Sequence, residues 1–275
     1  MSTALAAAPP REVVTTGPRL RSVLALTRVE SRRLITHPAI LVAPGLIVLE
    51  SARGPGTFQF LFLVGIGYFA IGIGTFVAAN LCASRSRRNK TEELYSSLPL
   101  RAADRTEAHL LSVAAPLTAA MLIGGVLAAV TRPWAGASAR LDVEPRLIMH
   151  GLPDFAQGPL LVAFLGVAGV VLARWFITPV AIPVVFAGIF AISSVTGLSP
   201  GPTHWLNPVA AYSSSGLEPA SVMPWHLVYL SGLILLFGLV AVARRPWPPG
   251  VHVYGAVAFA LTAVGGVMQV LAASP

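Results

Sequence analysis

The side chains that could perform chemistry in this chain are few and scattered. His150 and Asp154 have the i, i+4 spacing that suits two metal ligands on one helix, but Gly151 and Pro153 disfavour a helix there. The sequence has no glycine-rich loop for ATP phosphates and no H-E-x-x-H, C-x-x-C or G-x-S-x-G motif. Its single cysteine, Cys82, excludes an internal disulfide. We therefore predict no catalytic, cofactor-binding or metal-binding residue, and we expect that the chain is not an enzyme.

The polar loop at residues 85–109 has the most informative spacing. Asn89 and Glu92 are three residues apart, like an N-cap residue and its partner in a helix capping box. We predict a short helix from Glu92 to Ser97, which ends before Pro99 because proline cannot continue a helix. Such an element, placed between two membrane helices, could pass movement from a soluble partner into the membrane. A structured loop that only orients the two helices is the alternative.

The composition shows which solvent surrounds most of the chain. Hydrophobic residues make up 55% of it and charged residues only 11%, whereas soluble domains average about 25% charged residues. A soluble chain of 275 residues could not bury so much apolar surface. We therefore predict an all-α integral membrane protein with six to seven transmembrane helices.

The predicted elements follow from the apolar stretches. Residues 1–17 are rich in Ala, Pro and Thr and are expected to be a disordered tail. Residues 18–275 are predicted to form a single transmembrane domain, which begins with an interfacial helix at 18–36. Asp104 and Glu107 repeat the N-cap spacing and are expected to start the helix of the third span. The predicted spans lie at about 38–52, 58–83, 107–130, 157–173, 178–195, 225–243 and 252–272.

The basic residues are distributed unevenly between the two sets of loops. Fifteen of the 19 Lys and Arg residues precede the first predicted span or follow an even-numbered one. The exceptions are Arg53, Arg132, Arg140 and Arg146. Because Lys and Arg stay on the cytoplasmic side during insertion, we predict a cytoplasmic N-terminus and a cytoplasmic 85–109 loop. The net charge of +8 is expected to attract anionic membrane lipids and not nucleic acid, since it is clustered beside apolar spans.

The interfacial helix is predicted from an apolar stripe beside a basic stripe. The apolar stripe consists of Leu20, Val23, Leu24, Leu34 and Ile35. The basic stripe consists of Arg21, Arg28 and Arg32. An ordinary juxtamembrane helix with solvated arginines is the alternative, and both interpretations place the helix at the membrane surface.

The second predicted span carries glycines at a spacing of two helical turns. The pairs are Gly65 with Gly72 and Gly67 with Gly74. Small residues permit close helix packing in lipid. The pattern predicts a packing face, either between two copies of the chain or within one chain.

Residues 89–100, which read N-K-T-E-E-L-Y-S-S-L-P-L, resemble the coupling-helix region of permeases in the type-2 ABC exporter family. Two shorter segments also resemble that family, namely Thr36-His37-Pro38 before the first span and W-L-N-P-V at 205–209 before the sixth. The resemblance covers roughly residues 18–243. The family pattern has six spans with both termini inside. The predicted seventh span, at 252–272, is therefore a departure that leaves the C-terminal topology open.

The resemblance implies a non-catalytic, membrane-spanning permease subunit of an ABC transporter that exports its cargo. ATP and Mg would then be bound by a separate ABC ATPase subunit. The permease would work as an oligomer, either a homodimer or a heterodimer with a sister permease. The residues implied to dock on the ATPase are Glu92, Glu93, Leu94, Tyr95, Leu98 and Pro99. The bias of 18 Arg against one Lys indicates a GC-rich bacterial genome, and hence a bacterial plasma membrane.

Two other classes of function fit parts of the sequence. A membrane scaffold or anchor subunit would use the Arg-rich loops to recruit a soluble partner without any transport. A membrane-embedded lipid-modifying enzyme would need polar residues that converge near one interface, and the sequence offers no convincing set. No Asp or Glu lies inside the fourth to seventh predicted spans, which disfavours ion-coupled transport. An amphipathic, lipid-like, peptide or drug-like cargo is therefore more natural than an ion.

Overall fold

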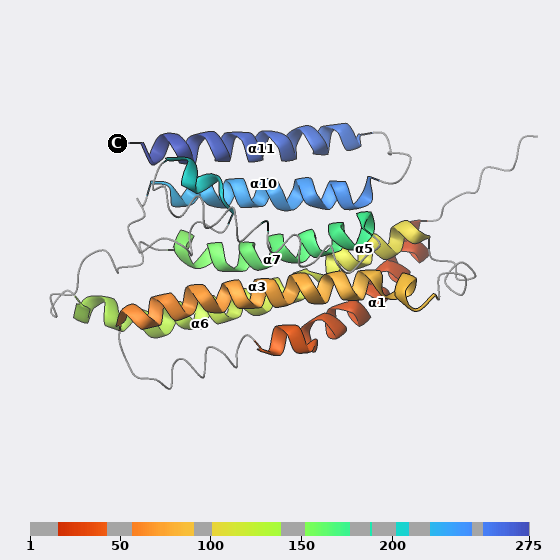
Figure 1. Ribbon diagram of the computed structural model, residues 1–275, viewed down its shortest axis with the longest axis horizontal. Helices are drawn as coiled ribbons and strands as arrows, with labels where there is room; N and C mark the ends of the chain where they lie inside the picture. Colours follow the sequence, from red (N-terminus) through yellow and green to blue (C-terminus); the bar gives the residue numbers. More distant parts are fainter. Residues whose placement is uncertain are drawn as a thin grey trace, which may run out of the picture.

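The described part of the chain is helical throughout. The computed structural model describes residues 16–42, 57–90, 101–138, 152–176, 188, 202–208, 221–243 and 250–274, and these ranges contain no strand. The elements are α1 (Thr16–Ile35), α3 (Thr57–Arg88), α5 (Ala102–Ser112), α6 (Ala114–Ser138), α7 (Leu152–Trp175), the 3₁₀ helix η2 (Pro202–Leu206), α10 (Met223–Val242) and α11 (Val251–Ala272). Figure 1 shows the long helices lying side by side in one bundle.

Five helices within the described ranges are long and apolar enough to cross a membrane. They are Gly67–Arg88, Ala102–Val126, Ala156–Trp175, Met223–Val242 and Val251–Ala272. They coincide with the second, third, fourth, sixth and seventh predicted spans, so the expectation of an all-helical membrane protein is supported. The part of the first predicted span that follows Val42 lies outside the described residues. The fifth predicted span, at 178–195, also lies outside them, except for the helical residue Gly188.

Helices α3 and α7 cross at very short range. A Cβ atom at Gly169 of α7 would overlap the backbone carbonyl of Phe76 in α3, and one at Gly72 of α3 would lie 2.7 Å from Leu165 Cδ1. The Asn80 side chain donates a hydrogen bond to the Gly169 carbonyl at 3.2 Å. Small residues allow this approach in a membrane protein, where close packing holds the helices together. The two helices are therefore packed in direct backbone contact.

The glycines that were predicted to form a packing face lie on α3. Gly72 meets Leu165 of α7, and a Cβ atom at Gly74 would overlap the carbonyl oxygen of Ala39. These two positions are therefore covered by atoms of the same chain. Gly67 is also buried, and the surroundings of Gly65 lie outside the described part.

Helix α11, the predicted seventh span, packs along α10 through a second set of glycines. A Cβ atom at Gly232 of α10 would lie 2.5 Å from the backbone nitrogen of Thr262, and one at Gly265 of α11 would lie 2.5 Å from the backbone nitrogen of Tyr229. Helix α10 in turn contacts α7, as Figure 1 shows. Helix α11 is thus built into the bundle through α10.

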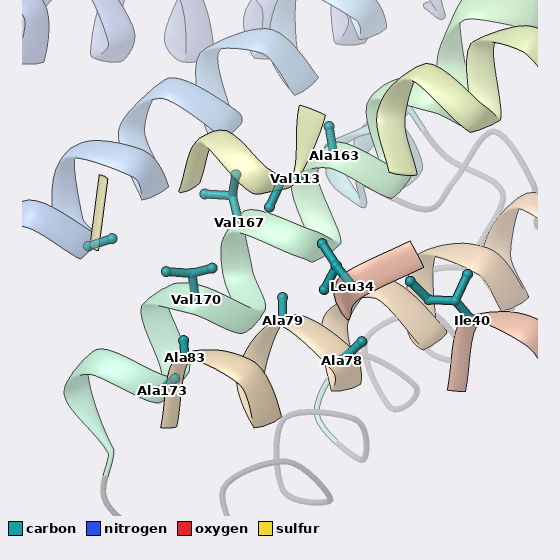
Figure 2. Close-up of a cluster of buried hydrophobic side chains, with 11 residues drawn as sticks. Leu34, Ile40, Ala78, Ala79, Ala83, Val113, Ala163, Val167, Val170 and Ala173 are labelled. Atoms are coloured by element: carbon teal, nitrogen blue, oxygen red, sulfur yellow. The ribbon is translucent and has the colours of Figure 1, made fainter. Parts of the chain in front are cut away.

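The main apolar core lies where α1, α3, α7 and the α5–α6 junction meet. Figure 2 shows Leu34 of α1 among small side chains of α3 and α7. The core residues are Leu34, Ile40, Ala78, Ala79, Ala83, Val113, Ala163, Val167, Val170, Ala173 and Ala241. Because most of them are alanine or valine, the helix backbones approach closely here.

The apolar stripe of α1 is divided between two environments. Val23 and Leu34 are buried, with 4% and 1% of their surface exposed. Leu20, Leu24 and Ile35 are exposed at 59%, 52% and 41%. One apolar side of the helix therefore packs on the bundle, while a second faces outward.

The helix of the third span begins earlier than predicted. Asp104 is the third residue of α5 and not its N-cap. The Asp104 Oδ2 atom accepts a hydrogen bond from the Arg101 backbone N–H at 3.2 Å, which is the reaching-back contact of a capping box. The helix breaks at Val113, between α5 and α6. The break precedes Pro116, which has no backbone N–H to continue the hydrogen-bond ladder.

The helical structure is interrupted at Thr36 and His37, after α1. The backbone N–H of Ala39 donates a hydrogen bond to His37 Nδ1 at 3.2 Å, so the imidazole caps the helical residues 38–42. Burial, followed by the positive charge of Arg88, lowers the pKa of His37. The ring therefore stays neutral and able to accept this hydrogen bond at neutral pH, and protonation in acid would remove the cap.

Candidate docking site at the basic end

We use the name basic end for the end of the bundle at which α3 and α7 finish and α5 begins (Figure 1). Arg85, Arg87 and Arg88 lie in the last turn of α3, and Arg174 lies in the last turn of α7. Arg87 Nη2 donates a hydrogen bond to the Arg174 carbonyl at 3.3 Å. Helix α1 contacts α5 at the same end.

The predicted docking segment connects α3 to α5 at the basic end. Its residues Glu92, Glu93, Leu94, Tyr95, Leu98 and Pro99 lie outside the described residues, but the residues on both sides are described. On the α3 side, the Lys90 backbone N–H donates a hydrogen bond to the Arg87 carbonyl at 3.2 Å. Lys90 has a φ angle of 54°, the left-handed conformation that commonly ends a helix. The chain therefore leaves α3 in a defined direction.

On the α5 side, Asp104 joins the start of α5 to α1. Its Oδ2 atom accepts a hydrogen bond from the Arg101 N–H at 3.2 Å, and its Oδ1 atom accepts one from Arg19 Nε at 2.9 Å. The carboxylate is almost fully buried, with 3% of the residue exposed. Arg19 also lies 3.1 Å from Glu107 Oε2. The hydrogen bond to Asp104 raises the pKa of Arg19 and outweighs the partial desolvation of the guanidinium.

A second buried carboxylate, Glu30, lies at the contact between α1 and α5. Glu30 is 6% exposed and accepts a hydrogen bond from Arg33 Nη1 at 2.6 Å. Its other oxygen lies 4.0 Å from His109 Nδ1 in α5. A buried carboxylate requires such partners, because desolvation of an unpaired charge is very costly. Helix α1 is thus joined to α5 by the ion pair between Arg19 and Asp104, whereas the ion pair of Glu30 with Arg33 lies within α1.

The geometry of the basic end is suited to transmitting movement. The segment at 91–100 is attached to a closely packed helix on one side and to the α1–α5 unit on the other. A displacement of the segment would therefore be passed to both units.

The described residues contain no group of three or more His, Cys, Asp or Glu side chains that could hold a metal ion.

The replacement of Asp104 by alanine is expected to lower the free energy of unfolding by about 2 kcal/mol, because a buried hydrogen-bonded charge is lost and the start of α5 loses its cap. Glu107→Ala is the matched control, since Glu107 contacts the same arginine from a side chain that is 36% exposed. Its loss should cost at most about 0.5 kcal/mol. Unfolding of both variants in one detergent tests this, and equal losses would contradict the role assigned to Asp104.

The opposite end of the bundle holds a buried polar cluster that sequence analysis did not identify. His226 of α10 and Gln269 of α11 are both fully buried, and His226 Nδ1 donates a hydrogen bond to Gln269 Oε1 at 3.0 Å. The Tyr229 hydroxyl donates a hydrogen bond to the Leu206 carbonyl at 2.8 Å, which holds η2 on α10. Trp205 packs edge to face on His226, with ring centroids 6.3 Å apart. Trp205 and Leu206, the first two residues of the W-L-N-P-V segment, therefore contact α10.

Neither a known protein family nor a curated protein nor a solved structure matches this chain. The features that bear on function are therefore the residues themselves and the geometry of the basic end. That geometry consists of a ten-residue connection whose two flanks are held by specific hydrogen bonds and ion pairs.

Proposed function

We propose that the chain is the membrane-spanning permease subunit of an ATP-driven ABC exporter, coupled to a separate ATPase through residues 89–100. The observation that carries the proposal is the anchoring of both flanks of this segment. Lys90, just after α3, has a left-handed conformation, and the backbone N–H of Arg101, the N-cap residue of α5, donates a hydrogen bond to the carboxylate of Asp104. A soluble partner that moved the segment would therefore move α3 and α5.

The packing of the bundle supports onward transmission of such a movement. Helix α3 meets α7 at backbone distance beside Gly169, so the two helices would shift together. Helix α5 is joined to α1 through Arg19 and Asp104, so these two would also shift together. Coupling between distant sites needs rigid, contiguous elements of this kind. The translocation pathway would change shape as one of these units moves against the other.

The proposal also assigns an orientation and partners. The basic end faces the bacterial cytoplasm, where the excess of Lys and Arg belongs. Leu94, Tyr95 and Leu98 supply an apolar anchor for a groove on the ATPase, and Glu92 and Glu93 pair with its basic residues. The ATPase binds ATP and Mg, and a second permease copy or a sister permease completes the pathway. Residues 89–100 are thus the surface on which the function depends.

Leu94→Asp and Tyr95→Ala are expected to uncouple ATP hydrolysis from export. The loss of an interface hot spot costs about 2 kcal/mol or more, which corresponds to roughly a thirtyfold weaker interaction. Substrate-stimulated ATPase activity of the reconstituted complex measures the effect. Ser96→Asp is the matched control, because it adds the same charge on the opposite side of the predicted helix. Normal stimulation and normal export in both variants would overturn the proposed coupling role.

A further inference from the structure

The five arginines of α1 fall into two structurally different groups. Arg19 is paired with the buried Asp104 of α5, and Arg33 is paired with the buried Glu30 of α1 itself. Arg21, Arg28 and Arg32 are exposed and have no ion-pair partner among the residues that the structure describes. The first group thus consists of ion-paired arginines, of which Arg19 joins α1 to α5, and the second group is exposed and points away from the bundle.

The exposed arginines lie beside an exposed apolar stripe. Leu20, Leu24 and Ile35 share one side of α1 and are 59%, 52% and 41% exposed. At 100° per residue, Arg21, Arg28 and Arg32 follow immediately around the helix from this stripe. The bundle-facing side carries Val23, Leu34 and Glu30 instead. Helix α1 therefore has three sides, which are protein-facing, apolar and basic. Figure 1 shows it on the outside of the bundle.

This arrangement matches the chemistry of an anionic membrane surface. A helix that lies in the interface places its apolar side among acyl chains and its arginines at the level of the phosphates. The planar guanidinium group binds phosphate oxygens through two parallel hydrogen bonds. We propose that the outward face of α1, formed by Leu20, Leu24, Arg21, Arg28 and Arg32, is a docking surface for anionic phospholipid headgroups.

The same helix also contacts the start of α5, and this extends the proposal to regulation. Arg19 is hydrogen-bonded to Asp104, whose carboxylate also accepts a hydrogen bond from the backbone N–H of Arg101, the N-cap residue of α5. Headgroups bound to the outward face of α1 thereby restrict the movement of the start of α5, which adjoins the docking segment. This extension rests on the proposed function, whereas lipid binding by α1 does not.

The test uses the full chain in vesicles of equal parts phosphatidylglycerol and phosphatidylcholine. A photo-crosslinking residue in place of Ala25, an exposed position of α1, captures the lipid that lies beside the arginines. The native sequence is expected to capture mainly phosphatidylglycerol. Replacing Arg21, Arg28 and Arg32 with glutamine should reduce this preference by up to about a hundredfold, since each basic side chain near an anionic surface contributes about fivefold. Replacing the same three with lysine should retain most of it.

The controls separate a local contact from a general effect of charge. A control variant has glutamine in place of Arg132, Arg140 and Arg146. It loses the same charge from the side of the membrane predicted to be opposite to α1, and it should leave capture at Ala25 unchanged. High salt should weaken capture in the native chain, because exposed charge contacts are screened. The proposed docking surface would be contradicted if the native chain captured both lipids in equal amounts, or if it captured protein in place of lipid.

A separate arm tests the link to α5. Arg19→Gln should leave phosphatidylglycerol capture intact, but should abolish the dependence of ATPase stimulation on that lipid. Intact capture without any associated ATPase would count against the proposed function and leave the lipid surface standing. Lipid-dependent stimulation that persists in Arg19→Gln would overturn the link through α5 alone.

Discussion

Gly169→Ala is expected to lower the free energy of unfolding by about 3 kcal/mol, at the upper end of the range for overpacking. The new methyl group would overlap the backbone carbonyl of Phe76, and a backbone cannot move aside as a flexible side chain can. Helices α3 and α7 would have to separate, which would also stretch the hydrogen bond from Asn80 to the Gly169 carbonyl. Thermal or denaturant unfolding in a mild detergent measures the loss.

Gly125→Ala provides the control for this prediction. Gly125 lies in α6, and a Cβ atom there would have no neighbour within 4 Å. Because alanine favours helix more than glycine, stability should stay constant or rise by up to about 1 kcal/mol. If the two variants lost equal stability, the contact between α3 and α7 would not be the close backbone crossing described here.

His226→Leu and Gln269→Leu are each expected to cost about 2 kcal/mol, because each leaves the other buried polar group without its partner. The two side chains are fully buried and bond to each other across α10 and α11. The Gln269 amide nitrogen has no further hydrogen-bond partner within the described part of the chain. The double leucine variant should therefore recover most of the loss, since no unsatisfied polar atom of the pair remains.

A double-mutant cycle measures this coupling directly. The two single variants and the double variant are unfolded under one set of conditions. A double variant close to the native chain supports the buried pair as a specific contact between α10 and α11. Strictly additive losses would show that the two side chains do not interact.

The membrane helices were predictable because lipid imposes a simple rule on the sequence. Each span must satisfy its backbone hydrogen bonds within one helix, so it appears as a long apolar stretch. The stretch at 252–272 was recognised in this way, and α11 spans Val251–Ala272. The glycine contact between Gly265 and the backbone of Tyr229 was not predictable, because spacing along one helix does not identify the partner helix.

The contacts at the basic end show a second limit of sequence analysis. Asp104 and Glu107 were correctly recognised as residues near a helix start, but the D-x-x-E pattern fits more than one helix start. The structure places Asp104 at the third position of α5. Its bond to Arg19, 85 positions away in the chain, depends on how α1 folds back on α5, and local patterns carry no such information.

The division of the apolar stripe of α1 into a buried and an exposed part was only partly visible in the sequence. The apolar and basic stripes were correctly identified, but the apolar stripe was treated as one surface. In the structure, Val23 and Leu34 face the bundle, whereas Leu20 and Leu24 face outward. A signal for this division was present in Glu30, which lies between the two buried positions. An acidic residue among apolar ones indicates a protein partner, since lipid cannot satisfy its charge.

Copurification provides the most direct test of whether residues 89–100 dock on a separate ATPase. The tagged full chain is purified in mild detergent, and the proteins that copurify are identified and quantified by mass spectrometry. We expect a P-loop ATPase in stoichiometric amount, which is lost from Leu94→Asp and retained by Ser96→Asp. Recovery of the intact protein with no ATPase, or with only other partners, would contradict the exporter proposal and favour a membrane scaffold.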